Sequence, residues 1–263
     1  MKKEFMFTSE SVTEGHPDKL CDQISDAFVD HFLKQDYCSR IIAECAVSTS
    51  ILFIAARFAS DHATIDFPSV ARKVIAKVGD DQEEFNSRTC SILTSLHEMH
   101  TEEQGNFNED KLTEAQIESI PAKNQVNVFG YACNHTPILM PLPIWLANKL
   151  ARRLVAVSRQ GDHAYLGLDG KTQVGIVFKD RMPHRVHSMT VTASQKKNAQ
   201  MPPEKLEEVI RETVIDAVFE DEPLKPDKNT KIFVNPDGPV FLGGPSIHSG
   251  LTGRKSAIDT YGQ

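Results

Sequence analysis

Apolar side chains recur every three or four positions in several stretches of the chain, a spacing that places them on one face of a helix. In residues 18–34 that face carries Leu20, Phe28 and Phe32. Pro17 suits the first turn of this helix, where its missing N–H costs no hydrogen bond. We predict three further amphipathic helices, over residues 66–79, 140–153 and 203–219.

Shorter runs rich in Val, Ile and Phe alternate with these helices and favour strands. The predicted strands are residues 40–46, 50–58, 90–96, 126–131, 171–178, 185–193 and 231–234. Strand pairs are followed by single helices more than once. We therefore expect an α+β fold in which helices cover sheets, and the pattern leaves open an internal pseudo-repeat.

The 263 residues are enough to bury a large core in one or two domains. A hydrophobic content of 40% and a charged content of 25% are typical of a soluble globular protein. The net charge of −7 argues against nucleic acid as a partner. The longest apolar run, residues 51–56, is too short to cross a membrane.

Five cysteines, an odd number, include no pair at a metal-ligand spacing. Free thiols in a reducing cytosol are the simplest explanation, because disulfides persist mainly in oxidising compartments. Nothing at the start of the chain resembles a signal peptide. We therefore expect a cytoplasmic protein that does not bind membranes.

The first candidate for chemistry is the start of the first predicted helix, where His16, Asp18 and Lys19 lie within four residues. A helix N-terminus has free N–H groups and partial positive charge, which favour phosphate. A carboxylate there could also hold a hard cation such as Mg²⁺. From spacing alone, an ordinary capped helix start explains the same residues somewhat better, because capping residues are favoured at such ends.

Two sequence motifs, far apart in the chain, suggest a function for these positions. Residues 10–19 read Glu-Ser-Val-Thr-Glu-Gly-His-Pro-Asp-Lys, and residues 22–27 read Asp-Gln-Ile-Ser-Asp-Ala. Near the other end, Gly-Gly-Pro at 243–245 precedes Gly-Leu-Thr-Gly-Arg-Lys at 250–255 and Asp-Thr-Tyr-Gly at 259–262. In these motifs the chain resembles methionine adenosyltransferase, also called S-adenosylmethionine synthetase.

The resemblance implies three similar α+β domains around a pseudo-threefold axis, of which this chain would contain two. The N-terminal domain would be discontinuous and comprise residues 1–12 and 135–242. The central domain would comprise residues 13–105 and 243–263, and residues 97–123 would form a flexible loop over the site. The C-terminal domain would be absent from these 263 residues.

The resemblance also implies roles for individual residues. The catalytic residues would be His16, Lys171 and Arg254. The ATP and triphosphate ligands would be His16, Lys19, Asp169, Lys171, Arg254 and Lys255. Asp18 would bind Mg²⁺, Glu44 would bind K⁺, and Gln104 would contact methionine.

Without the resemblance, the sequence allows another role for several of these residues. Asp169-Gly170 is also a strong turn signal ahead of a strand. Glu44, inside a predicted strand, is equally consistent with a side chain that faces solvent. The polar interval 97–123 fits a solvated insertion as well as it fits a lid.

The implied reaction is attack of the methionine sulfur on the ribose 5′ carbon of ATP, with the triphosphate leaving and then being hydrolysed to phosphate and pyrophosphate. The implied cofactors are Mg²⁺ and K⁺, and the implied assembly is a homodimer or larger homo-oligomer with the site between subunits. The alternative is a non-catalytic or truncated relative that binds nucleotide, or a full-length partner, without turnover.

Several positions depart from the family pattern. Asn124 replaces an acid, Val240 an aromatic residue near adenine, and His248 the acid after Gly-Gly-Pro. Arg57 lies near the position of an acid that would meet the substrate ammonium. Because the family's Gly-rich loop with two lysines and an aspartate does not follow, we expect residues 1–263 alone to make little S-adenosylmethionine.

Overall fold

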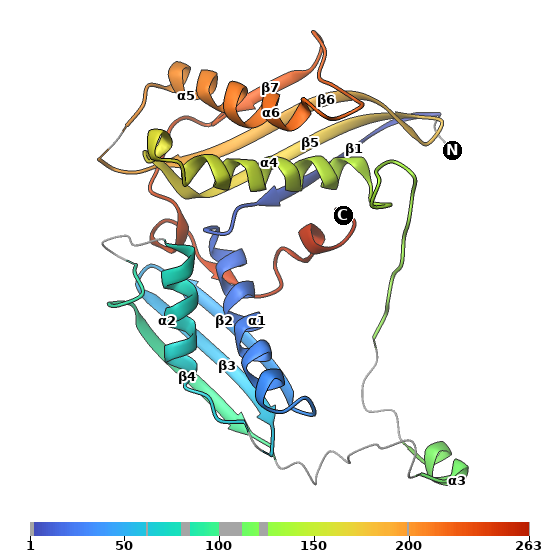
Figure 1. Cartoon of the computed structure of the whole chain (residues 1–263), viewed down its shortest axis with the longest axis vertical. Coiled ribbons are helices and arrows are strands. Elements are labelled where there is room, and N and C mark those ends of the chain that lie inside the picture. Colours follow the sequence, from blue (N-terminus) through green and yellow to red (C-terminus); the bar gives the residue numbers. More distant parts are fainter. Residues whose placement is uncertain are drawn as a thin grey trace.

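The computed structural model describes residues 3–61, 63–79, 85–99, 112–120, 126–198 and 200–262. It consists of two β-sheets, each with helices on one face, stacked one above the other in Figure 1. The α+β fold predicted from the sequence pattern is confirmed.

The first sheet, sheet A, has the strand order β1-β5-β6-β7, and β8 pairs with β6 beside β7. Its strands are β1 (Glu4–Val12), β5 (Leu166–Lys179), β6 (Met182–Gln195), β7 (Lys231–Val234) and β8 (Val240–Phe241). Strands β1, β5 and β6 are antiparallel, whereas β7 and β8 run parallel to β6. Strand β1 therefore joins a sheet whose other strands come from the second half of the chain.

Helix α4 (Leu142–Ser158) packs along β1 and β5 of sheet A. Beside it, α5 (Pro203–Ile210) continues through a π-helical turn, η4 (Arg211–Asp216), into α6 (Ala217–Phe219). The apolar faces of these helices and the inward residues of β5 and β6 form one core. The helical stripes predicted over 140–153 and 203–219 are the faces that this core buries.

The second sheet, sheet B, has the strand order β4-β3-β2-β9. Its strands are β2 (Arg40–Ser48), β3 (Ile51–Ala59), β4 (Ser91–Glu98) and β9 (Gly250–Leu251). Helices α1 (Pro17–Gln35) and α2 (Phe67–Val78) cover one face and supply Phe28, Phe32 and Phe67 to its core. The first two predicted strands, residues 40–46 and 50–58, correspond to the antiparallel pair β2–β3.

No described element covers the opposite face of sheet B, which we call its bare face. Buried and exposed residues alternate along β3, where Leu52 and Ile54 face the helices while Ile51 and Phe53 are exposed. Ile42 on β2 and Leu93 on β4 are also more than half exposed, at 65% and 54%. This face is an apolar surface of a kind that monomers seldom present to water.

Two sequence predictions fail in the connection between the sheets. Residues 126–131, predicted as a strand, have no strand partner among the described residues, and Val126, Val128 and Phe129 are exposed. Within the predicted polar interval, residues Glu114–Glu118 form a short helix, α3, capped by Thr113. An apolar run becomes a strand only where a neighbour accepts its hydrogen bonds, and no such neighbour follows from local sequence.

The turn considered at Asp169-Gly170 is also wrong, because both residues lie inside β5, which starts at Leu166. Gly170 is closely packed: a Cβ there would come within 2.8 Å of Leu154 and of the carbonyl oxygen of Thr192. The glycine therefore allows close packing with the helix and the neighbouring strand rather than chain reversal.

The chain crosses between the sheets where β1 leads into α1 and where β8 leads to β9. The boundaries predicted for the two discontinuous domains stay a prediction. In the described part of the chain, no helix is both long enough and apolar enough to cross a membrane.

Candidate active site between the two sheets

His16 caps the N-terminus of α1, at the point where the chain leaves sheet A. Its Nδ1 accepts a hydrogen bond from the backbone N–H of Asp18 at 3.2 Å. The side chain is 2% exposed, and its second nitrogen, Nε2, is buried without a hydrogen-bond partner among the described residues. The cap thus fixes the ring and leaves one polar atom available.

The environment keeps this imidazole neutral. The pKa of His16 is lowered from 6.5 to about 4, chiefly by burial and also by His248 and Lys171, against the opposing effects of Asp169 and Asp18. Because Nδ1 accepts a hydrogen bond, the single proton of the neutral ring is on Nε2. His16 therefore presents a buried N–H donor, which suits a phosphate oxygen.

Asp169 on β5 lies next to this donor and anchors the loop after β8. Its Oδ2 accepts the backbone N–H of Gly244 and the Nε2–H of His248, both at 2.8 Å. Burial alone raises the pKa of Asp169, but these hydrogen bonds and the nearby histidines outweigh it and lower the pKa overall. The carboxylate is therefore ionised, and its Oδ1 is buried with no partner in the described structure.

His16, Asp169 and His248 form one cluster. Their potential ligand atoms all lie within 4.8 Å of one another, and the two imidazole rings meet edge-on at 4.9 Å between centroids. Because Nδ1 of His16 accepts a hydrogen bond and Nε2 carries the proton, His16 has no free lone pair for a metal ion; the open groups of the cluster are this N–H donor and Oδ1 of Asp169. The sequence marked His248 only as a departure, and its contact with Asp169 depends on a loop that local patterns do not predict.

Asp18 connects α1 to β9. Its Oδ1 accepts the backbone N–H of Leu251 at 3.0 Å and lies 3.7 Å from Nη1 of Arg254. Gly250 permits this contact, since a Cβ there would lie 2.2 Å from the carbonyl carbon of Pro17. One carboxylate oxygen is thus used to hold the structure, and the other, Oδ2, faces Nδ1 of His16 at 3.9 Å.

Two of the three predicted lysines of the site, Lys19 and Lys255, have acidic partners. Lys19 contacts both oxygens of Asp259 at 2.6 and 2.7 Å, and Lys255 contacts Oε1 of Glu10 at 2.6 Å. Lys171 is exposed on β5, opposite Val12 of β1. Neither acid was expected, because each pairs with a lysine more than two hundred residues away.

Other predicted site residues are not part of this cluster. Glu44 is exposed on β2, while the next residue, Cys45, is buried against α1, so the carboxylate points to the bare face of sheet B. Arg57 is exposed on β3, and Val240 begins β8. Gln104 and Asn124 lie outside the described residues.

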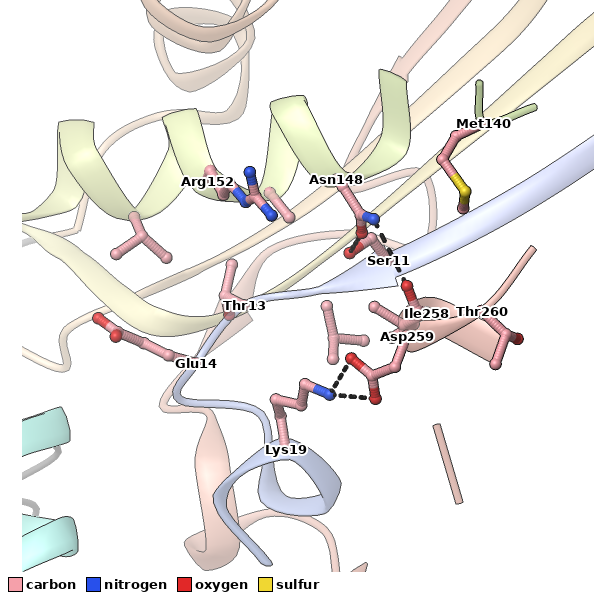
Figure 2. A pocket seen from close by; sticks show the side chains of 13 residues that line it. Ser11, Thr13, Glu14, Lys19, Met140, Asn148, Arg152, Ile258, Asp259 and Thr260 are labelled. Carbon is pink, nitrogen blue, oxygen red and sulfur yellow. Dashed lines mark hydrogen bonds and ion pairs between the residues drawn. The ribbon is translucent and has the colours of Figure 1, made fainter. Parts of the chain in front are cut away.

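A cavity of about 490 Å³ lies next to the cluster, between the end of β1, the start of α1, α4 and the short helix η6 (Ser256–Asp259). Figure 2 shows Lys19 and Asp259 paired across its lower side and Asn148 of α4 on its upper side. His16, Asp169, Lys171 and Arg254 do not line it. These four residues therefore lie beside the cavity and do not form part of its lining.

The fold and this constellation define a class: α+β proteins whose polar site joins the start of a helix to a distant Gly-Leu-Thr-Gly-Arg-Lys segment. Residues 4–101 match the family model described as S-adenosylmethionine synthetase, N-terminal domain, and residues 119–240 match its central domain. The chain belongs to the S-adenosylmethionine synthetase family.

Curated relatives agree with this assignment. The chain is 42% identical to an S-adenosylmethionine synthase of Microcystis aeruginosa, over 100% of the chain and 66% of the relative. It is 40% identical to those of Gloeothece citriformis, over 100% and 66%, and Thermosynechococcus vestitus, over 98% and 65%. The chain thus spans a little under two thirds of the length of these relatives.

Proposed function

We propose that this chain carries the ATP-binding part of a methionine adenosyltransferase, which forms S-adenosylmethionine from ATP and L-methionine. The strongest support is that polar residues from distant segments of the chain meet at one place. His16 and Asp18 from the start of α1, Asp169 from β5, and Arg254 from the last segment meet between the two sheets. Segments so distant in sequence have no local reason to gather their polar side chains.

In the proposed reaction the methionine sulfur forms a bond to C5′ of ATP while the bond from C5′ to the triphosphate oxygen breaks. The sulfur is a good nucleophile without deprotonation, so no general base is needed. The site has two tasks, which are to align sulfur with carbon and to stabilise the leaving triphosphate. The Nε2–H of His16 and the cations Lys171 and Arg254 would serve the second task.

The residues present fit Mg²⁺, which prefers oxygen ligands and keeps several waters alongside one or two carboxylates and substrate phosphates. Oδ2 of Asp18 is the oxygen not used for Leu251, and Oδ1 of Asp169 has no partner in the described structure. We assign Mg²⁺ to Asp18. Bound there, it would neutralise part of the triphosphate charge.

We also propose a homodimer formed through the bare face of sheet B. Its exposed Ile42, Phe53 and Leu93 would be buried by the same face of a second copy. Glu44 lies on this face, so the K⁺ that we assign to it would sit near the subunit contact. Sedimentation of wild type and Phe53→Glu tests this: a dimer that the charge dissociates supports it, and a wild-type monomer at micromolar concentration contradicts it.

Calorimetric titration with ATP and with tripolyphosphate tests the proposed binding site. We expect binding that requires Mg²⁺ and weakens roughly tenfold, or about 1.4 kcal/mol, in Lys171→Ala or Arg254→Ala. Lys228→Ala, an exposed lysine outside the site, is the matched control. If the folded wild-type chain binds neither ATP nor tripolyphosphate with Mg²⁺ present, the proposal is wrong.

A second candidate, a relative that binds nucleotide without turnover, is favoured by one observation. Oδ2 of Asp169 is already held by His248 and Gly244, so a substrate has only Oδ1 to contact. Incorporation of labelled methionine into S-adenosylmethionine separates the two candidates. Turnover near the common enzyme range of about 1 s⁻¹ or above supports the enzyme, whereas ATP binding without product supports the second candidate.

A further inference from the structure

A second and larger cavity, of about 910 Å³, is lined by a different set of residues. It is bordered by the C-terminal ends of α2 and α4, which approach each other between the two sheets in Figure 1, and by the start of β5 and the end of β6. His16, Asp169, Lys171 and Arg254 do not line it. Its size is within the range of small-molecule sites.

Within the described part of the chain, the charged residues that line this cavity are all cations, namely Lys77, Arg159, Lys196 and Lys197. Arg159 is paired with Glu14, but the three lysines have no ion pair with another described residue. Cations at helix C-termini are expected, since they interact favourably with the helix dipole, and this accounts for Lys77 and Arg159. It does not account for Lys196 and Lys197, which follow a strand.

Gln195 provides the second, independent observation. The side chain lines the cavity and is 1% exposed. Its Oε1 accepts the backbone N–H of Met201 at 2.7 Å, which fixes the orientation of the amide. Its Nε2 is buried and has no partner among the described residues. The unsatisfied group is therefore a donor, and it requires an acceptor.

A second unsatisfied polar group belongs to another lining residue, Ser246. Oγ of Ser246 lines the cavity, is buried, and has no partner in the described structure. Between these polar groups, Val78, Leu166 and Leu168 contribute an apolar wall. Donors and cations with an adjoining apolar wall match an anion attached to an organic body.

We propose that this cavity binds a phosphorylated small molecule, at a site separate from the candidate active site. The phosphate oxygens accept hydrogen bonds from Nε2 of Gln195 and interact with Lys196 and Lys197. The apolar part of the ligand packs against Leu166 and Leu168. A phosphate fits better than a single carboxylate, because several cations and neutral donors converge on the cavity while no acid among the described residues lines it.

The experiment titrates inorganic pyrophosphate into the Lys171→Ala chain by calorimetry, so that the candidate active site contributes little. We expect one site to remain, and we expect Lys196→Glu with Lys197→Glu, added to that background, to weaken it more than tenfold. The matched control reverses two exposed lysines outside the cavity, Lys179→Glu and Lys228→Glu, and should weaken binding far less. Equal losses in both pairs would reduce the effect to net charge and overturn the proposal.

Gln195→Glu is the more specific variant. It keeps the oxygen that accepts from Met201 and replaces the donor with a second acceptor, so pyrophosphate binding should again fall more than tenfold. Circular dichroism and thermal melting show whether the Gln195→Glu variant folds. If it does not fold, the variant with Lys196→Glu and Lys197→Glu provides the test. Absence of pyrophosphate binding to the Lys171→Ala chain at millimolar concentration, with wild-type binding intact, would overturn the proposal while leaving the proposed function standing.

Discussion

The candidate active site has a buried half and an exposed half, and the two are built differently. His16, Asp18 and Asp169 are each at most 8% exposed, and backbone N–H groups orient all three. Lys171 and Arg254 are exposed and have no backbone contact of that kind holding the charge. The buried half therefore contributes to stability as well as binding, whereas the exposed half supplies charge that can be removed at little structural cost.

The largest expected effect is on the pH dependence of stability, because His16 is buried as a neutral ring. Its pKa is about 4 in the folded protein and 6.5 ordinarily, so the unfolded chain binds the proton more tightly. Stability is therefore fully present above pH 6.5 and falls as the pH drops toward 4, by up to about 3 kcal/mol.

Urea unfolding of wild type and His16→Asn between pH 7 and pH 4 measures this effect. Asparagine is a good N-cap, so the variant should keep the helix start while losing the titration. The expected result is a flatter stability profile for the variant over this range. Parallel profiles would mean that groups other than His16 account for the loss.

The next effect concerns the backbone contact that supports the buried half. Gly250→Ala places a Cβ within 2.2 Å of Pro17, so β9 must move away from α1. We expect a loss of about 1–3 kcal/mol, as for other overpacked sites, together with weaker ATP binding. Gly130→Ala is the control, because a Cβ there meets nothing within 4 Å. Equal unfolding free energies for the two variants would contradict the close contact.

Asp18 separates the structural and the metal-binding tasks of one carboxylate. Asp18→Ala leaves the N–H of Leu251 without its acceptor and should cost about 1–3 kcal/mol of stability. Asp18→Asn keeps an acceptor oxygen and should recover much of that stability without recovering Mg²⁺-dependent ATP binding. Glu44→Ala should affect the Mg²⁺ dependence less than either. If the Asp18→Asn variant binds ATP and Mg²⁺ like wild type, Asp18 is not the metal ligand.

The sequence predicts much of the fold because amphipathic stripes and apolar runs are local signals. Helices α1 and α2 were predicted to within about two residues. The failures have physical causes. Residues 126–131 have a strand composition without a strand partner, and α3 shows a capping box, Thr113 with Gln116, that could have revealed it.

The site was less predictable than the fold. Its polar residues could be identified from the two sequence motifs, but their bonding could not. Asp18 meets the N–H of Leu251, and Asp169 meets His248, only because two sheets and a crossing segment are stacked in space. Likewise, the unpaired Nε2 donor of Gln195 follows only from the hydrogen bond between its Oε1 and the backbone N–H of Met201. No periodicity encodes contacts of this range.

The smallest expected effect on stability is at Lys255, in the exposed half. Its ion pair with Glu10 is partly solvated, and such pairs contribute about 0–1 kcal/mol. Lys255→Ala should therefore leave the unfolding free energy nearly unchanged while weakening binding of tripolyphosphate with Mg²⁺. Glu10→Gln breaks the same ion pair but frees the lysine, so it should strengthen that binding slightly or leave it unchanged. If both variants weaken binding alike, the ion pair positions the lysine, and the exposed half is as fixed in place as the buried half.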